Sequence, residues 1–339
     1  MKRIISLLLT LALCIGALCS CGLYEQIFKP EKMPLRIGYM AGPTGMGMAK
    51  LISDNGGLEN GNELYQFTKY TDTATAKADL AAGNVDIICL PTNEAAMYFA
   101  TVDKSAKVLA VNCLNSLYLL TEGDSKVTSL ADLEGQTVYT CKNGTPRVVL
   151  EYIVDALKLN ITVSYSVNGK ELVTPQDLST CVVTGQIPNA VMPEPLVTSS
   201  LLTITKNGDP SISYTVDVDL ADEWAKISDT PITMGCILAD GDVARDRQKD
   251  IEILLTDYKA SVEFIANPEN LDSAADYVVK TGVMAAAPAA KKALTNLGDA
   301  IAYLDGEPMK AALVAFYSAI GVTLPSDSFY YEKNSSFIR

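Results

Sequence analysis

Apolar runs and amphipathic stretches alternate along the first half of the chain. Three apolar runs predict β-strands, and a stretch with helical periodicity follows each of them. The strands are expected at 35–40, 64–70 and 85–90, and the helices at 46–52, 73–82 and 92–99. The third run is almost wholly apolar, as in a parallel sheet that is covered on both faces. This alternation predicts a doubly wound α/β sheet.

A second series of the same kind follows. Strands are expected at 137–140, 161–166 and 190–192, and helices at 147–157 and 175–183. Residues 83–91 align with residues 185–193 at an offset of 102, and the same offset places Gly42 on Gly144. Chance similarity is one explanation, because few residues are identical. The other explanation is two lobes of like design whose strands end at one shared cleft.

Beyond residue 240 the pattern becomes mostly helical. A long amphipathic helix is expected at 244–265, followed by helices at 272–280, 289–297 and 309–320. We expect this tail to pack on the first lobe, and the chain to cross between lobes near 111–120 and 230–238. The sequence thus predicts an α/β protein with two doubly wound lobes joined by two crossing strands. Lobe 1 is expected to comprise residues 35–115 and 231–339, and lobe 2 residues 116–230.

The N-terminal segment has the pattern of a secretory signal. Two basic residues precede an apolar stretch at 4–17, which is too short to span a bilayer comfortably. The following Leu18-Cys19-Ser20-Cys21 resembles a bacterial lipobox, with an aliphatic residue three positions before the cysteine. We expect a signal peptide at 1–20, a lipidated Cys21 that holds the protein at the membrane, and a tether at 21–34. The alternative is an ordinary cleaved signal with a chance cysteine.

Composition and charge narrow the function classes. The 339 residues are 48% hydrophobic, enough for a large core, and the net charge is −13. Without Lys2 and Arg3 of the signal, 25 basic side chains face 40 acidic ones, and this balance of −15 argues against nucleic acid as a partner. The sequence has no histidine, which removes the commonest general base and metal ligand. Catalysis is therefore disfavoured, and we expect no catalytic residue, no metal site and no cofactor.

Five cysteines lie beyond the expected anchor, each in a different apolar segment. They are Cys89, Cys113, Cys141, Cys181 and Cys236. An odd number of cysteines cannot pair completely within one chain. We interpret them as small buried hydrophobic residues, with a disulfide such as Cys141–Cys181 as the alternative.

Two loops that open helices are the candidate ligand-binding elements. They are Gly42-Pro43-Thr44-Gly45-Met46 and Asn143-Gly144-Thr145-Pro146-Arg147. The first is not a Walker loop, because Met48 and Ala49 stand where Lys and Ser or Thr are required. Unpaired N–H groups at a helix start can bind an anion or a carbonyl oxygen. The alternative is two ordinary turns, which weakens if both loops lie at strand carboxyl ends that face one crevice.

Polar residues after two further strands are candidates for the same crevice. Thr92 and Asn93 follow the predicted strand at 85–90, and their alternative role is helix capping. Glu194 lies between two prolines after the strand at 190–192. Its carboxylate is expected to accept hydrogen bonds from a ligand, and the alternative is an interlobe brace.

The predicted crossing and the first strand supply the remaining candidates. Asn115 lies at the first crossing, together with Asn112 and Ser116, where these side chains would line the floor of the cleft. Tyr39 is placed to stack on a planar solute, although such tyrosines are more often core residues with a bonded hydroxyl.

Several stretches, in their order along the chain, resemble the nitrate/sulfonate/taurine/thiamine-precursor class of ABC-transporter substrate-binding proteins. They are residues 35–39, 83–87, 132–138, 185–195 and 324–331. The resemblance covers nearly the whole chain after the signal, and it implies the type II periplasmic-binding-protein fold with a hinge that closes two lobes on a ligand. It also implies ligand contacts from the loops at 42–46 and 143–147 and from Glu194. Pro188 departs from the class, which has an acidic residue there.

The signal pattern and the lipobox-like motif predict an extracytoplasmic lipoprotein at the cell membrane, and the resemblance implies its role. Such a protein captures a small organic molecule and delivers it to the permease of an ABC importer, and we expect it to be a monomer. Arg147 is the only arginine of the candidate loops, which favours a monoanion or a neutral planar heterocycle over a doubly charged anion. Two alternatives remain: an enzyme on the same fold that acts on a small heterocycle or aromatic acid, and a surface lipoprotein that senses its ligand.

Overall fold

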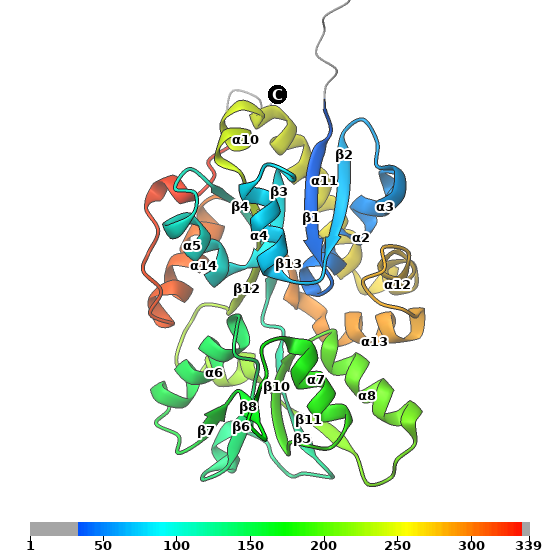
Figure 1. Cartoon of the computed structure of the whole chain (residues 1–339), viewed down its shortest axis with the longest axis vertical. Coiled ribbons are helices and arrows are strands. Elements are labelled where there is room, and N and C mark those ends of the chain that lie inside the picture. Colours follow the sequence, from blue (N-terminus) through cyan, green and yellow to red (C-terminus); the bar gives the residue numbers. More distant parts are fainter. Residues whose placement is uncertain (1–32, 334–339) are drawn as a thin grey trace, which may run out of the picture. The chain divides into compact units, whose positions relative to one another are not determined.

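Two mixed β-sheets organise residues 33–333, which are the residues that this computed structural model describes (Figure 1). The residues from Leu35 onward form one compact unit. The expected signal peptide, Cys21 and most of the expected tether lie outside the described residues. Within 33–333, no helix is both long and apolar enough to cross a membrane.

The first sheet contains six strands in the order β13-β4-β12-β3-β1-β2. Their bounds are β1 Leu35–Met40, β2 Tyr65–Tyr70, β3 Ile87–Pro91, β4 Lys107–Leu114, β12 Thr233–Ala239 and β13 Ile301–Leu304. Strand β1 is parallel to β2 and β3, whereas β12 is antiparallel to β3 and β4. Ile88 and Leu90 of β3 belong to one hydrophobic cluster, and Ile87 and Cys89 to another, so helices cover both faces as predicted.

The second sheet contains five strands in the order β11-β5-β10-β6-β7. Their bounds are β5 Leu117–Glu122, β6 Thr137–Tyr139, β7 Thr162–Ser164, β10 Asn189–Pro193 and β11 Tyr214–Asp219, and a separate pair is β8 Ser166–Val167 with β9 Lys170–Glu171. Strand β6 is parallel to β7 and β10, and β5 is antiparallel to β10 and β11. Each sheet thus has three neighbouring parallel strands followed by an antiparallel one, which matches the predicted lobes of like design.

The helices between the strands repeat at the predicted offset. In the first lobe they are α2 Pro43–Asp54, α3 Gly57–Asn60, α4 Thr73–Ala81 and α5 Thr92–Thr101, and in the second α6 Thr145–Ala156, α7 Pro175–Val183 and α8 Leu196–Asn207. Adding 102 to both bounds of α2, α4 and β3 gives the bounds of α6, α7 and β10. Gly42 and Gly144 are the N-caps of α2 and α6, and each of these helices carries a proline in its first turn. This agreement favours related lobes over chance similarity.

Two segments carry the chain between the lobes. The first joins β4 to β5, and the second joins α9 Leu220–Trp224 to β12. Asn115 of the first segment donates its N–H to the carbonyl of Ile232 at 3.0 Å, and the Ile232 N–H returns a bond to Asn115 Oδ1 at 2.9 Å. The two crossing segments are therefore fastened to each other where the chain leaves lobe 1.

The part of the chain after β12 is mainly helical and packs on the first lobe. Its helices are α10 Gly241–Asp246, α11 Gln248–Ala266, α12 Leu271–Lys280, α13 Ala287–Leu297 and α14 Gly306–Ala319. The short 3-10 helices among residues 33–333 are η1 Leu130–Leu133, η2 Pro268–Asn270, η3 Gly298–Ala300 and η4 Asp327–Phe329. Ser261 of α11 donates to the carbonyl of Gly47 in α2 at 2.7 Å. The single helix predicted at 244–265 is wrong, because the backbone of Arg247 leaves the helical region (φ −119°, ψ 32°) and separates α10 from α11.

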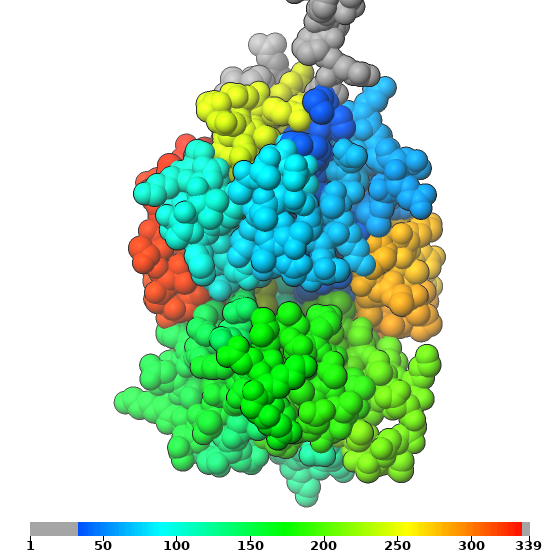
Figure 2. Space-filling view, in the orientation of Figure 1, coloured from blue at the N-terminus to red at the C-terminus, as the bar shows by residue number. Residues whose placement is uncertain are grey.

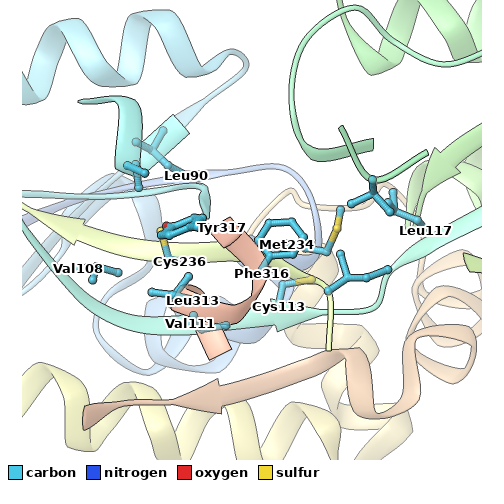
Figure 3. Close-up of a cluster of buried hydrophobic side chains, with 14 of the residues drawn as sticks. Leu90, Val108, Val111, Cys113, Leu117, Met234, Cys236, Leu313, Phe316 and Tyr317 are labelled. Atoms are coloured by element: carbon cyan, nitrogen blue, oxygen red, sulfur yellow. The ribbon is translucent and has the colours of Figure 1, made fainter. Parts of the chain in front are cut away.

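A hydrophobic cluster runs through the crossing region and connects the two lobes. Trp224 of α9 lies 5.2 Å from Tyr152 of α6 and 5.6 Å from Phe316 of α14, measured between ring centroids. Figure 3 shows Phe316 beside Met234 and Cys113. Met234 lies near the start of β12, and Cys113 lies near the end of β4. The interpretation of the five cysteines is confirmed, since all of them are free and buried.

Replacing Phe316 tests this shared core. Phe316 is fully buried, so Phe316→Ala should lower the free energy of unfolding by about 3–5 kcal/mol. Ser318→Ala on the exposed side of the same helix should change it by less than about 0.5 kcal/mol. Denaturant unfolding followed by circular dichroism measures both. A loss below about 1 kcal/mol for Phe316→Ala would contradict the described packing.

Candidate functional site

The carboxyl ends of the parallel strands meet between the two lobes. Helices α2 and α5 begin after β1 and β3, and helices α6 and α8 begin after β6 and β10. Thr145 Oγ1 at the start of α6 donates to Asn93 Oδ1 at the start of α5 at 3.1 Å. In the space-filling view a furrow marks the boundary between the lobes (Figure 2). Open α/β sheets bind ligands at such strand ends, so this crevice is the candidate site.

The first predicted loop combines open and buried positions. The carbonyl of Gly42 accepts the N–H groups of Gly45 and Met46, both at 3.0 Å, so these two donors are already bonded. Met46 is fully buried, and a Cβ on Gly45 would lie 2.2 Å from the carbonyl oxygen of Met40, so both serve helix packing. Gly42 has open space around its Cα, and Pro43 and Thr44 are partly exposed. Gly42, Pro43 and Thr44 are therefore the part of this loop that a ligand can reach.

The second predicted loop presents an exposed Asn143 followed by Gly144, whose φ of +90° favours glycine. Thr145 is buried and bonds to Asn93, and Pro146 is buried in the first turn of α6. The main-chain groups of this loop lie at the crevice, while its two buried side chains hold the turn in place.

Arg147 is held against its own lobe. Its Nε lies 3.5 Å from Glu151 Oε2, and its Nη1 donates to the carbonyl of Lys142 at 3.3 Å. The guanidinium carbon lies 5.6 Å from the ring centroid of Tyr165. The positive charge of Arg147, which the sequence analysis considered for an anionic ligand, is therefore partly offset by the carboxylate of Glu151.

Thr92 and Glu194, which follow β3 and β10, are fully engaged within the protein. Thr92 Oγ1 donates to the carbonyl of Thr233 at 2.6 Å, and its side chain is fully buried. Glu194 is 1% exposed and accepts bonds from the Thr198 N–H at 3.1 Å, the Thr198 hydroxyl at 2.8 Å and Asn296 Nδ2 at 2.7 Å. Burial raises the pKa of Glu194, and these three bonds and the charge of Lys292 act in the opposite direction. The structure favours the brace, not ligand contact, as the role of Glu194.

Tyr39 and Asn115 also have internal partners. The Tyr39 hydroxyl donates to the carbonyl of Thr281 at 2.8 Å, and the side chain is fully buried in lobe 1, as in the alternative interpretation. Burial raises the pKa of Tyr39 well above its ordinary value. The Asn115 side chain accepts the Ile232 N–H and so connects the two crossing segments.

Asn112 has a side-chain oxygen that lacks a partner within the described residues, which makes it a stronger candidate than the sequence indicated. It is fully buried in β4, and among the described residues its Oδ1 has no hydrogen-bond partner. A Cβ on Gly235 would lie 2.8 Å from this oxygen and 2.4 Å from Thr44 Cγ2, so all three residues meet beneath the start of α2. The only indication of this role in the sequence was that Asn112 is a polar residue inside an apolar strand. The role of Asn296 had no signal at all, because a lone asparagine on a helix is usually solvated.

Solved structures share this fold, although no protein-family model and no curated protein sequence matches the chain. An ABC transporter protein from Parabacteroides distasonis is 19% identical, with a TM-score of 0.68 over 89% of this chain and 100% of that one. The periplasmic aliphatic sulphonate binding protein of Escherichia coli is 17% identical, with a TM-score of 0.65 over 90% and 94%. The periplasmic nitrate-binding protein of Synechocystis is 14% identical, with a TM-score of 0.58 over 83% and 75%. The protein thus has the type II periplasmic-binding-protein fold of ABC-importer binding components, with two lobes, two crossing strands and a helical tail on the first lobe.

The raised pKa of Glu194 predicts a pH-dependent contribution to stability. In the unfolded chain this carboxyl ionises near its ordinary pKa of 4.5, whereas the folded protein keeps the proton to higher pH. The folded state binds more protons in that window, so the contribution of Glu194 to stability falls as pH rises from about 4.5 to the raised pKa. The free energy of unfolding of wild type minus that of Glu194→Gln should therefore decrease with pH. Denaturant titrations at several pH values measure this difference, and a constant or rising difference would contradict the prediction.

Proposed function

We propose that this protein is an extracytoplasmic solute-binding protein of an ABC importer. It captures a small organic molecule between its two lobes and delivers it to the permease. The observation that carries the proposal is the meeting of the α5 and α6 starts through Asn93 and Thr145. This contact lies in a fold that is shared over nearly the whole length with importer binding components. In this proposal lobe 1 comprises residues 35–115 and 231–339, and lobe 2 residues 116–230.

The proposed contact set is narrower than the sequence prediction. It keeps the exposed or partly exposed positions of both loops and Asn93: Gly42, Pro43, Thr44, Asn93, Asn143, Gly144 and Arg147. The buried Asn112 is added because its Oδ1 has no hydrogen-bond partner among the described residues. The residues that are buried or bonded within the protein are left out: Tyr39, Gly45, Met46, Thr92, Asn115, Thr145, Pro146 and Glu194. Because Glu151 partly offsets Arg147, recognition rests mainly on neutral hydrogen-bonding groups, which favours a neutral or singly charged solute.

Closure follows from the construction of the hinge. The crossing segments are fastened by Asn115 and Ile232, so the lobes can turn about them while each sheet stays intact. A solute that contacts both loops favours the closed form, because it makes both sets of contacts only there. Delivery to a permease needs release without chemical change, and the lack of histidine agrees with binding without turnover.

The anchor remains part of the proposal. The lipobox-like Leu18-Cys19-Ser20-Cys21 supports a lipid on Cys21, which would hold the solute-binding unit at the membrane surface beside its permease. A tether at 21–34 would then connect the lipid to the first strand.

Filling the crevice tests the proposed binding site. Gly42 has φ 164°, which any residue adopts, and apart from its two chain neighbours no residue lies within 4 Å of the place that a Cβ would occupy. Gly42→Trp should therefore fold normally and exclude solute. Wild-type protein, purified without added ligand, should release a small molecule detectable by mass spectrometry, and that compound should raise the melting temperature. Gly42→Trp should lose at least about tenfold in affinity by calorimetry, equivalent to about 1.4 kcal/mol.

Leu324→Trp is the matched control, because Leu324 is 48% exposed on a loop of the tail. It should bind the compound like wild type. Unchanged affinity in Gly42→Trp would place the solute elsewhere, and conversion of the compound to a product would favour an enzyme.

Metabolic labelling tests the anchor. Cells that express the full chain and receive radioactive palmitate should label the wild-type protein, and Cys21→Ala should abolish the label. Cys19→Ala is the control and should keep it, because the lipobox-like pattern positions Cys21 as the lipidated residue. Label that persists in Cys21→Ala would refute this site.

A further inference from the structure

One residue of the helical tail makes three hydrogen bonds to the opposite lobe. Asn296 lies on α13, and its Nδ2 donates to Glu194 Oε1 at 2.7 Å and to Thr198 Oγ1 at 3.2 Å. Its backbone carbonyl accepts the hydroxyl of Tyr118 at 2.9 Å. We call these four residues, Asn296, Glu194, Thr198 and Tyr118, the Asn296 clamp.

The two sides of the clamp are rigidly held by different lobes. Leu294 and Leu297, which flank Asn296 on α13, pack in the hydrophobic cluster of lobe 1. Glu194 and Thr198 follow β10, and Tyr118 lies in β5, so all three belong to the second sheet and its helices. The bonds of Asn296 therefore run from one lobe to the other, while the bonds from Thr198 to Glu194 stay within one lobe.

The side of the clamp that belongs to lobe 2 is buried enough to influence closure. Glu194 and Thr198 are 1% and 0% exposed, and Tyr118 is 8% exposed. A hydrogen bond to a buried carboxylate is stronger than one between neutral groups. Asn296 itself is exposed, so the cost of opening falls on the Glu194 carboxylate, which loses one of its donors.

We propose that the Asn296 clamp sets the equilibrium between open and closed forms before any solute binds. The proposal rests on the two-lobe closure proposed above and adds its regulation. None of the clamp residues belongs to the proposed contact set, so the clamp contributes free energy to closure without contacting solute. A clamp that raises the closed fraction of the free protein lowers the apparent dissociation constant of every solute by the same factor.

A reciprocal exchange of side chains tests the clamp. Asn296→Asp places a carboxylate against Glu194, and the two like charges should open the lobes at about pH 8. In the double variant Glu194→Gln/Asn296→Asp, the new amide at 194 can donate to the new carboxylate at 296, and its oxygen can still accept the N–H of Thr198. The single variant should show a larger radius of gyration than wild type by small-angle X-ray scattering of dialysed full-length protein, and the double variant should recover the wild-type value.

Thr295→Ala is the matched control, because Thr295 is exposed on the same helix and bonds only to its own helix at Lys291. It should leave the radius unchanged. Asn296→Ala introduces no charge and should also enlarge the radius, so it carries the test if the charged variant fails to fold. Equal radii for wild type and both Asn296 single variants, or a double variant as large as Asn296→Asp, would overturn the clamp. No solute is needed, so failure here leaves solute binding standing, and the Gly42→Trp result does not decide the clamp.

Discussion

The direction of four strands is the constraint on which the site depends. Strands β1 and β3 are parallel in one sheet, and β6 and β10 are parallel in the other, so the loops that follow them leave from the same edge of each sheet. Two crossing segments fastened at Asn115 then turn those edges toward each other. Glycines and small polar side chains are thereby collected in one crevice without any single motif that binds a ligand.

The aromatic packing in the crossing region is apolar, whereas the contacts described across the crevice are polar. The aromatic contact between Trp224 and Phe316 continues the hydrophobic core through the crossing region. The contacts across the crevice are polar instead: Thr145 with Asn93, and Asn296 with Glu194. A polar contact can be replaced by water at small net cost, whereas an exposed apolar contact cannot. This division would permit the closure proposed above without loss of the fold.

Two charged side chains near the crevice, Glu194 and Arg147, have partners within the protein. Glu194 is enclosed by donors from both lobes, and Arg147 is held by Glu151 and by the ring of Tyr165. What remains for a solute is mostly neutral, including the buried Oδ1 of Asn112 beneath the start of α2. Solved structures of this fold include proteins named for sulphonate and nitrate binding. We therefore propose that this crevice selects its solute through hydrogen bonds and shape, and not through attraction of a strong anion.

The sequence by itself predicted most of the helices and strands and the repeat, because side-chain periodicity and helix-start residues such as Gly42 and Gly144 act over a few neighbouring positions. It did not predict helix α8 or strand β13. It failed at Arg247, where one backbone rotation divides a continuous apolar stripe without changing its periodicity. It also left open whether Tyr39, Thr92 and Glu194 face a ligand or the protein. Their partners lie 242, 141 and 102 residues away along the chain, so only the tertiary structure brought those partners together and decided their roles.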